Sequence, residues 1–538
     1  MPLLDNSTLR RAIDNVANWG DTDIFPLPIE NHVFHDMPDR IVPLLSGMSS
    51  NFDSEINKFP VISYSTLAPV GYAGFRWATQ IEPAWNAYLL ACVIALEPGI
   101  ENARLPVDSG KVYSYRYQQD ATDHSLFTLD SWGKFQENTR QLAEDHSYVV
   151  SVDIGDFYAR IYHHSLENAL LAIDRDGGVT NHIMAILSRL SNRASYGLPV
   201  GGPAARIMSE LVLDRVDHLI EAEPIISTFC RYADDYRFFV DDIQAAYRSI
   251  GILSEKLLRN EGLTLQKSKT RIMKSSEYLA VLDPLDPPQG SAGAFLHLHI
   301  HYDPYSATAD EDYERLRDQL DEFDILSLLR TELSKGRIHP ALTRRLVQAL
   351  RYLDAGTRQA AVLSLLENIP ALSPVVPQVM MAIRDCMSDL DDGFVSLIHG
   401  QIRRLIQENH YVTQVDLNLS FMIRVLAGRR SIENELLLIR LYQSPHGFGG
   451  ASAPYVQRDI MLILARWSVK YWLSDQKNYI ASAHPWVKRA FLVGSYELRD
   501  EGKHWRNANK ASMSPFDMIV RDWVTDRRQH DSIWRVPI

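Results

Sequence analysis

The sequence predicts an α+β domain over residues 1–300 followed by an all-α domain over residues 301–538. From residue 60 to about 300, short β-rich runs alternate with helical patterns, as expected of a mixed domain. The segment 284–293, PLDPPQGSAG, is rich in Pro and Gly, which end regular structure. After it the pattern is almost wholly helical, so we expect the domain boundary near residue 300.

Residues 1–60 are expected to form a helix followed by loops that pack on the first domain. Residues 148–154, YVVSVDI, form an apolar run of strand length. Residues 229–240, FCRYADDYRFFV, have the pattern of two aromatic-rich strands joined by a tight turn that contains aspartates. These strands carry the acidic residues on which the functional interpretation depends.

The second domain is expected to be an array of stacked helical hairpins. Leu342, Leu346, Leu350 and Leu353 fall on one face of a helix within residues 339–354. Similar amphipathic segments recur roughly every 15 to 25 residues to the end of the sequence. We find no strict repeat signature, so the prediction is an α-solenoid-like domain.

The composition is that of a globular protein. Charged residues make up 23% of the 538 residues, and the formal net charge is −12. Three cysteines, Cys92, Cys230 and Cys386, are too few for a disulfide framework and too far apart for a zinc cluster. No run of about 18 apolar residues occurs, so we expect a cytoplasmic protein with no membrane partner. The acidic balance means that any nucleic-acid channel must be locally basic or small.

Acidic residues at strand ends are the main candidates for chemistry. Asp153 lies near the end of the first apolar run, where an unpaired charge is costly, so a metal ion or an Arg partner is implied. Asp234 and Asp235 are adjacent carboxylates, which repel each other unless solvent or divalent cations neutralise them. The alternative is a solvated hairpin turn, which is how we interpret Asp241 and Asp242.

Two further segments gain meaning only from their context. Residues 196–216 contain a Gly-rich turn and then a helix with Pro203 at its first position, so the backbone there could approach a nucleotide closely. Lys269 stands near the start of a predicted strand, where lysine is usually plain surface. His163 and His164 are interpreted as the start or cap of a helix, not as metal ligands.

In this order and spacing, the segments resemble the palm motifs of reverse transcriptases. Asp153 with Phe157 and Tyr158 is similar to the first motif, and residues 198–201 are similar to the second. Residues 232–235, YADD, resemble the third motif, and Lys269 within residues 265–270 resembles the basic residue of the fourth. The resemblance covers about residues 60–300 and implies reverse-transcriptase-like fingers and palm.

The remainder of the chain narrows the resemblance. A long acidic chain with a helical second half is similar to the bacterial abortive-infection and defence-associated reverse transcriptases, in particular the prophage-encoded abortive-infection polymerases. The runs at 112–116, VYSYR, and at 484–506 strengthen this match. The resemblance implies an all-α, HEAT-like helical-repeat domain, a homo-oligomer such as a trimer or hexamer, and a role in phage defence in the cytoplasm of the bacterial host.

The same resemblance assigns the metal ligands. Two Mg²⁺ ions, replaceable by Mn²⁺, would lie about 3.5 to 4 Å apart, one activating the attacking hydroxyl and one bridging the triphosphate. Asp153 and Asp234 are the expected principal ligands and Asp235 an auxiliary one. The carbonyl of Ile154 could add an oxygen, because Mg²⁺ prefers hard oxygen donors.

It also assigns residues to the incoming deoxynucleoside triphosphate. Tyr158 would hold a ring against the sugar and exclude a 2′-hydroxyl. Lys269 would stand near the pyrophosphate as a proton donor to the leaving group. Arg116 and Lys111 are candidates for clasping the triphosphate, with ordinary surface charge as the alternative.

One departure from the family pattern concerns the template. Templated reverse transcriptases commonly have Gln where this chain has Val200, next to Gly201, and Val cannot donate a hydrogen bond. The similar abortive-infection polymerases make single-stranded DNA without a template and start chains on a protein hydroxyl, to which the product stays attached. Tyr64 and Tyr72 are the candidates for that hydroxyl here.

Three other functions are weighed. The first is a templated RNA-dependent DNA polymerase of the retron or intron-maturase kind, which a basic C-terminal module would have favoured. A viral-type RNA-dependent RNA polymerase is opposed by Tyr158. A catalytically silent scaffold is opposed by intact Asp153, Asp234 and Asp235.

Overall fold

The computed structural model describes residues 3–72, 74–119, 123–224, 226, 228–282, 295, 316, 319–320, 323–531 and 533–538. The chain forms two compact units. Unit 1 comprises Met1–Ser65, Ala78–Leu285 and Ser514–Ile519, and unit 2 comprises Thr66–Trp77, Asp286–Met513 and Val520–Ile538. The segment 284–293 and the boundary expected near residue 300 lie outside the described residues.

Unit 1 begins with four helices, α1 (Asn6–Trp19), α2 (Glu30–Asp36), α3 (Pro38–Ser50) and α4 (Phe52–Lys58). Asp5 caps α1 by accepting a hydrogen bond from the Thr8 amide, and Leu9, Ile13 and Val16 form its buried stripe. The expectation of one helix followed by loops is therefore wrong for residues 30–58. The short polar breaks between these helices hid their apolar periodicity.

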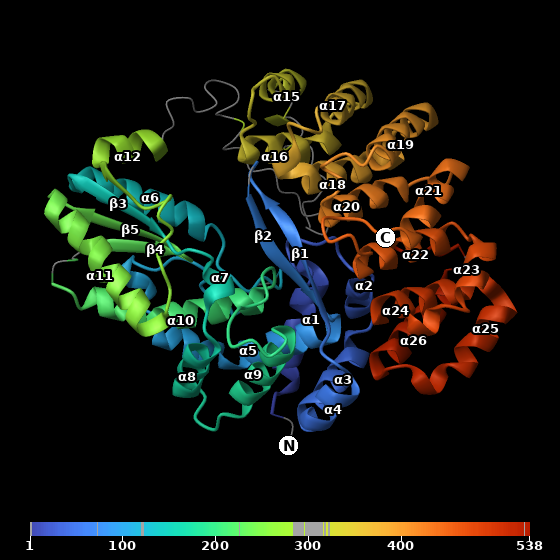
Figure 1. The fold of residues 1–538 in the computed structure, drawn as a ribbon, viewed down its shortest axis with the longest axis horizontal. Helices are drawn as coiled ribbons and strands as arrows, with labels where there is room; N and C mark the ends of the chain where they lie inside the picture. The colour runs from blue at the N-terminus through green and yellow to red at the C-terminus, as the bar shows by residue number, and fades with distance from the viewer. Residues whose placement is uncertain are drawn as a thin grey trace. The chain divides into compact units, whose positions relative to one another are not determined.

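The sheet of unit 1 has the strand order β4-β5-β3-β6 (Figure 1). Its strands are β3 (Tyr148–Asp153), β4 (Phe229–Tyr232), β5 (Asp235–Val240) and β6 (Arg271–Lys274). All neighbouring strands are antiparallel, and Tyr148 pairs with Val240 at one end of β3 while Asp153 pairs with Asp235 at the other. The strand and hairpin expected over residues 148–154 and 229–240 are present.

Helices pack on this sheet and on each other. Helices α6 (Ser131–Asp145) and α12 (Ser275–Leu282) pack on the sheet and enclose a core with Val149, Cys230 and Phe239. Helix α11 (Ile243–Glu261) packs on β3 and β5, and α10 (Pro203–Glu221) packs on α11. The remaining helices of unit 1 are α5 (Pro83–Ala103), α7 (Phe157–Arg160), α8 (His163–Ile173) and α9 (Gly178–Leu190). Pro203 starts α10 and His163 starts α8, as expected.

Strands β1 (Ser63–Val70) and β2 (Gly74–Ile81) form a separate hairpin. Its outer residues, Thr66–Trp77, belong to unit 2. The loop-like region expected around Tyr64 and Tyr72 is therefore a strand and a turn.

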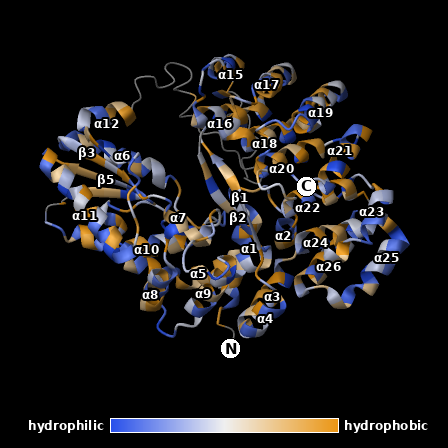
Figure 2. Ribbon diagram, in the orientation of Figure 1, coloured by the Kyte–Doolittle hydropathy of each residue, from blue (hydrophilic) through white to orange (hydrophobic). Residues whose placement is uncertain are grey.

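Unit 2 is helical apart from these hairpin residues, within the residues that the structure describes. Its helices are α15 (Ile325–Leu333), α16 (Pro340–Ala349), α17 (Ala355–Glu367), α18 (Val376–Cys386), α19 (Asp392–Gln407), α20 (Asp416–Leu426), α21 (Ile432–Gln443), α22 (Pro454–Arg466), α23 (Lys470–Gln476), α24 (Pro485–Gly494), α25 (Arg499–Ala508) and most of α26 (Pro515–His530). From α15 to α22 each helix packs against the next but one, and α22 packs against α24. Figure 2 shows apolar and polar residues on different sides of these helices. Leu342, Leu346 and Leu350 are buried, as the stripe predicted, but the helix ends at Ala349 and the half-buried Leu353 lies beyond it in extended backbone.

Among the described residues, no helix is long and apolar enough to cross a membrane. Cys92, Cys230 and Cys386 are unpaired and buried.

Candidate active site

The three predicted carboxylates meet at one end of the sheet. Asp153 is the last residue of β3, Asp235 is the first residue of β5, and the two are register partners. Asp234 lies in the turn before β5, and the amide of Ile154 donates to its carbonyl at 3.1 Å. Because β3 and β5 are antiparallel, the last residue of β3 and the first residue of β5 bring their carboxylates to the same end of the sheet.

Mutual repulsion and burial define the electrostatics of this edge. Burial, followed by the charges of Asp153 and Asp235, raises the pKa of Asp234 to about 6. Burial also raises the pKa of Asp235, while Arg237, 3.4 Å from its carboxylate, opposes that rise. Asp234 and Asp235, whose pKa values are raised beside a third carboxylate, form the kind of setting in which a bound cation gains the most.

Lys269 supplies one cation to the site. Its Nζ donates to Asp153 Oδ2 at 2.7 Å, and this bond raises the pKa of Lys269. The lysine side chain is 63% exposed, so it is free to move when another cation binds Asp153. Lys269 thus takes the place of the Arg partner that was one of the two expectations for Asp153, and Arg237 is a second cation beside the carboxylates that was not expected from the sequence.

The donor set fits hard divalent cations. Within the described part of the chain, no three Asp, Glu, His or Cys side chains already surround one point. Asp153, Asp234 and Asp235 nevertheless bring carboxylate oxygens to adjacent backbone positions, and Lys269 occupies the place of a cation on Asp153. These residues are the ones that could hold Mg²⁺, which prefers carboxylate oxygens.

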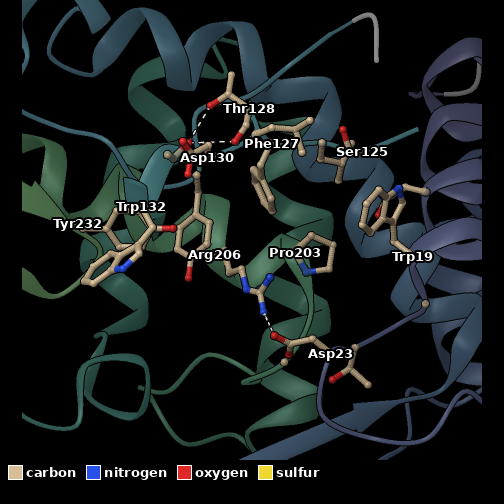
Figure 3. Close-up of a pocket in the computed structure, with 18 residues that line it drawn as sticks. Trp19, Asp23, Ser125, Phe127, Thr128, Asp130, Trp132, Pro203, Arg206 and Tyr232 are labelled. Carbon is tan, nitrogen blue, oxygen red and sulfur yellow. Dashed lines mark hydrogen bonds and ion pairs between the residues drawn. The ribbon is translucent and has the colours of Figure 1, made fainter. Parts of the chain in front are cut away.

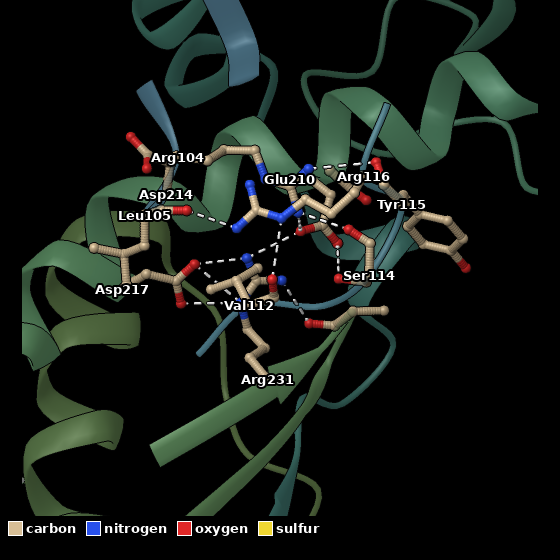
Figure 4. A network of polar contacts seen from close by, with 12 residues as sticks. Arg104, Leu105, Val112, Ser114, Tyr115, Arg116, Glu210, Asp214, Asp217 and Arg231 are labelled. Carbon is tan, nitrogen blue, oxygen red and sulfur yellow. Dashed lines mark hydrogen bonds and ion pairs between the residues drawn. The ribbon is translucent and has the colours of Figure 1, made fainter. Parts of the chain in front are cut away.

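A buried ionic network braces the turn that carries Asp234 (Figure 4). Arg231 is fully buried, and its Nη2 donates to Asp217 Oδ2 at 2.6 Å and lies 3.0 Å from Glu210. Its Nη1 donates to the carbonyl of Ala233 at 3.0 Å, and Ala233 has a φ of 52°. A non-glycine residue in the left-handed region needs such support, so Arg231 fixes the turn beside Asp234.

The network continues into the segment before the sheet. Glu210 accepts hydrogen bonds from Arg104 at 2.7 Å and from the Ser114 hydroxyl at 2.6 Å. The hydroxyl of Tyr236 donates to Asp217 at 2.9 Å. This network was not predicted from the sequence. The sequence signal for it is that Glu210 and Asp217 are seven residues apart on α10, which places them on one helix face.

Arg116 and Lys111 do not reach the carboxylates. Arg116 is buried, and its guanidinium binds Glu101 at 2.9 Å and the carbonyls of Val112 and Leu105. Lys111 forms an ion pair with Glu221. The predicted role of Arg116 at the triphosphate is therefore corrected, because its guanidinium is buried among fixed partners, whereas Lys111 is held by a partly exposed ion pair and its role stays a prediction.

Tyr158 and the loop with Val200 and Gly201 lie side by side. The carbonyl of Tyr158 accepts from the Leu198 amide at 2.8 Å, and burial raises the pKa of Tyr158 well above its usual value. The carbonyl of Val200 accepts from Thr79 at 2.9 Å. Gly201 has a φ of 134°, and a Cβ there would overlap the Thr22 hydroxyl, so glycine is required.

Two cavities reach the segment 232–235, one through Tyr232 and the other through Asp235. One of about 390 Å³ is lined by Gly201, Arg206 and a group of aromatic side chains, Trp19, Tyr115, Phe127, Trp132 and Tyr232 (Figure 3). Arg206 contacts Asp23 at its rim. A second cavity of about 250 Å³ is lined by Asp235 together with three cations, Arg237, Lys269 and Arg271. Asp235 therefore lines a cavity that combines basic side chains with apolar ones such as Phe135 and Met273.

The two priming candidates differ in their surroundings. Tyr64 lies in β1, in unit 1. Tyr72 lies in the hairpin turn, where its hydroxyl donates to the Ala371 carbonyl at 2.9 Å and accepts from the Ile338 amide at 2.7 Å, all within unit 2. The Tyr72 hydroxyl is therefore committed to a structural role, which corrects its selection as a candidate.

Comparison with known proteins agrees with the site. Residues 96–282 match the family model described as reverse transcriptase (RNA-dependent DNA polymerase). The matched segment contains Asp153, Asp234, Asp235 and Lys269, so the chain carries a reverse-transcriptase-like domain, the type found in nucleotidyltransferase polymerases. No curated protein matches the sequence. A solved structure of apo telomerase from Candida tropicalis is similar over 74% of this chain and 70% of that chain, with 10% identity and a TM-score of 0.27, a level that supports no argument.

Proposed function

We propose that this protein is a metal-dependent DNA polymerase that works without a template, starts chains on its own hydroxyl and acts in phage defence. The catalytic part of this proposal rests on one observation: Asp153, Asp234 and Asp235 lie together at one end of the sheet. Two Mg²⁺ ions, or Mn²⁺, bound there would activate the attacking hydroxyl and neutralise the triphosphate.

The residues of the chain divide the reaction among them. Asp153 and Asp234 hold the cations, with Asp235 and the Ile154 carbonyl as further oxygen donors. The acceptor hydroxyl would lose its proton to water, its oxygen would bond to the α-phosphorus of a deoxynucleoside triphosphate, and the bond to pyrophosphate would break. Lys269, released from Asp153 when a cation binds, donates a proton to the departing pyrophosphate. Tyr158 excludes a ribose 2′-hydroxyl.

Template independence is supported by the loop at Val200. Its side chain has no hydrogen-bond donor, and its backbone carbonyl is already bound to Thr79. The chain's own residues cover the loop, because Thr22 lies against Gly201 and the Asp21 backbone lies against Gly202. Asp21 and Thr22 are themselves buried, so this side of the loop is packed against the chain's own residues.

Protein priming is supported by chemistry and by charge. A phenol ionises more easily than an aliphatic alcohol, with a pKa of about 10, and a neighbouring divalent cation favours the phenolate. A chain with a net charge of −12 is poorly suited to capturing a free primer. Tyr64 remains the candidate nucleophile. The HEAT-like helical unit would assemble the chain into a trimer or hexamer, and the single-stranded DNA product would stay attached.

The test incubates purified protein with labelled deoxynucleotides, Mg²⁺ and no added nucleic acid, beside Asp234→Asn and Tyr64→Phe. The label should stay with the polypeptide through denaturation. A DNA nuclease should shorten the labelled product, and only a protease should release it as free DNA. Asp234→Asn should give no label, and Tyr64→Phe should remove it only if Tyr64 is the primer. DNA that separates on denaturation alone would end the protein-priming proposal.

The second candidate is a templated RNA-dependent DNA polymerase, favoured by the description of the family model that matches residues 96–282. It predicts that an added RNA template with a DNA primer stimulates incorporation strongly and dictates the product sequence.

In cells, phage plating should fall with the wild-type chain and recover with Asp234→Asn. Unchanged plating in both would refute the defence role.

A further inference from the structure

Unit 2 contains a polar cavity of about 530 Å³ that the polymerase chemistry does not use. It lies where α20 and α22 end, and residues 533–536 complete its wall. Five of its lining side chains are arginines, Arg429, Arg430, Arg466, Arg528 and Arg535. Glu497 is the acidic side chain of the lining.

Part of this charge has a structural explanation. Arg429, Arg430 and Arg528 form ion pairs with Asp392, Glu435 and Glu497 at 2.7 to 2.8 Å. Arg430 also donates to the carbonyl of Trp467, just after α22 ends, in the manner of a cation that satisfies helix-end carbonyls. These three arginines therefore need no ligand.

Arg466 and Arg535 have no such explanation. Arg466 donates to the Val536 carbonyl at 3.0 Å, and in the described part of the chain neither arginine forms an ion pair with a carboxylate. Arg466 is half-buried, and burial together with the nearby Arg535 lowers its pKa. Packing two like charges beside one cavity is unfavourable unless an anion joins them.

We infer that this cavity binds the phosphate groups of a nucleotide through Arg466 and Arg535. Guanidinium groups bind phosphate oxygens in a bidentate way, and the volume is that of a small-molecule pocket, larger than a bare anion requires. Trp467 and Trp534 also line the cavity and offer aromatic surface to a base. The phosphates could belong to a free nucleotide or to a DNA strand, and the inference does not depend on the proposed polymerase activity.

Metal-free conditions distinguish nucleotide binding in this cavity from nucleotide binding at the palm carboxylates. In EDTA the palm carboxylates repel a triphosphate, whereas arginines bind it without a cation. Binding of fluorescent dATP to the full chain should be measured by anisotropy in EDTA, with unlabelled dATP, pyrophosphate and a short single-stranded oligonucleotide as competitors. The double variant Arg466→Gln/Arg535→Gln should weaken binding at least about tenfold. Asp153→Asn should not weaken it.

Two further variants control for folding. Arg535→Gln alone changes an exposed side chain and should weaken binding by a smaller factor with an unchanged melting temperature. Arg404→Gln removes an equally exposed arginine on α19, paired with Glu408, and should bind like wild type. Competition by dATP and pyrophosphate supports a free nucleotide, and competition by the oligonucleotide with little by pyrophosphate supports strand phosphates. Absence of binding in wild type, wild-type affinity in the double variant, or loss of binding in Asp153→Asn would overturn the inference.

Discussion

Replacing Asp234 by Asn should stabilise the metal-free protein and abolish nucleotide transfer at the same time. The pKa of Asp234 rises from 3.8 to about 6 because the carboxyl is buried beside Asp153 and Asp235. One pKa unit corresponds to about 1.4 kcal/mol, so the charged form costs at most about 3 kcal/mol above pH 6. Asp234 is partly exposed and solvent screens the repulsion, so a gain of about 1 to 3 kcal/mol is expected for the variant.

The sign follows from proton linkage. Between pH 3.8 and about 6 the folded protein holds the Asp234 proton more tightly than the unfolded chain does, so wild-type stability falls as pH rises through this window. The stability of the Asn variant should not fall in this way, because Asn does not ionise. The difference in unfolding free energy should therefore grow from about pH 4 to about pH 6 and level off above.

Thermal and urea unfolding in EDTA, across this pH range, measure the difference. Asp241→Asn is the matched control, because Asp241 also follows an apolar strand but its side chain is 71% exposed, and it should have no effect. Added Mg²⁺ should stabilise wild type more than Asp234→Asn, since binding energy adds to folding energy. A destabilised Asp234→Asn protein at pH 8 in EDTA would refute the repulsion argument. Incorporation within about tenfold of wild type would refute the metal assignment, because loss of a ligand should cost at least about a thousandfold.

Three other substitutions test the remaining parts of the site. Lys269→Ala should tighten Mg²⁺ binding, because Asp153 loses its internal cation. It should also slow nucleotide transfer, because the leaving group loses its proton donor. A variant that binds Mg²⁺ more weakly in a titration, or that transfers nucleotides as fast as wild type, would contradict this. Arg231→Met leaves buried Asp217 unpaired and should lower the free energy of unfolding by about 3 to 5 kcal/mol, measured in urea, whereas a loss below about 1 kcal/mol would mean that the network is not structural. Tyr158→Ala should narrow the preference for deoxynucleotides over ribonucleotides in paired incorporation assays, and unchanged discrimination would move the gate elsewhere.

The strands of the palm and their acids were predictable because the signals are local. An apolar run of strand length that ends in Asp153 can be recognised without knowing its neighbours. The YADD turn is likewise flanked by its own two strands, and the antiparallel hairpin fixes Asp235 within a few residues. What remained open was the register that pairs Asp153 with Asp235, since nothing local to β3 selects its partner strand.

Arg116 and Tyr72 were misassigned for the opposite reason. Each has the flexible, polar sequence context that is typical of a substrate-binding loop, yet each is held by groups that its own segment does not reveal. Arg116 binds Glu101, fifteen residues earlier, and the Tyr72 hydroxyl binds the Ala371 carbonyl, 299 residues later. Exposure and available donors are properties of the folded packing, and sequence context alone cannot supply them.

The sign of the neighbouring charges distinguishes the catalytic acids from the structural ones. Both Asp153 and Arg231 are charged residues in apolar strands, and by the same desolvation argument each must have a partner. Arg231 lies between two acids, Asp217 and Glu210, so its network closes within the protein and needs no ligand. Asp153 lies beside two further carboxylates and has one mobile lysine. With Lys269 and Arg237 as its neighbouring cations, the cluster of three carboxylates keeps an excess of negative charge, which favours an external cation and makes this end of the sheet the candidate place for chemistry.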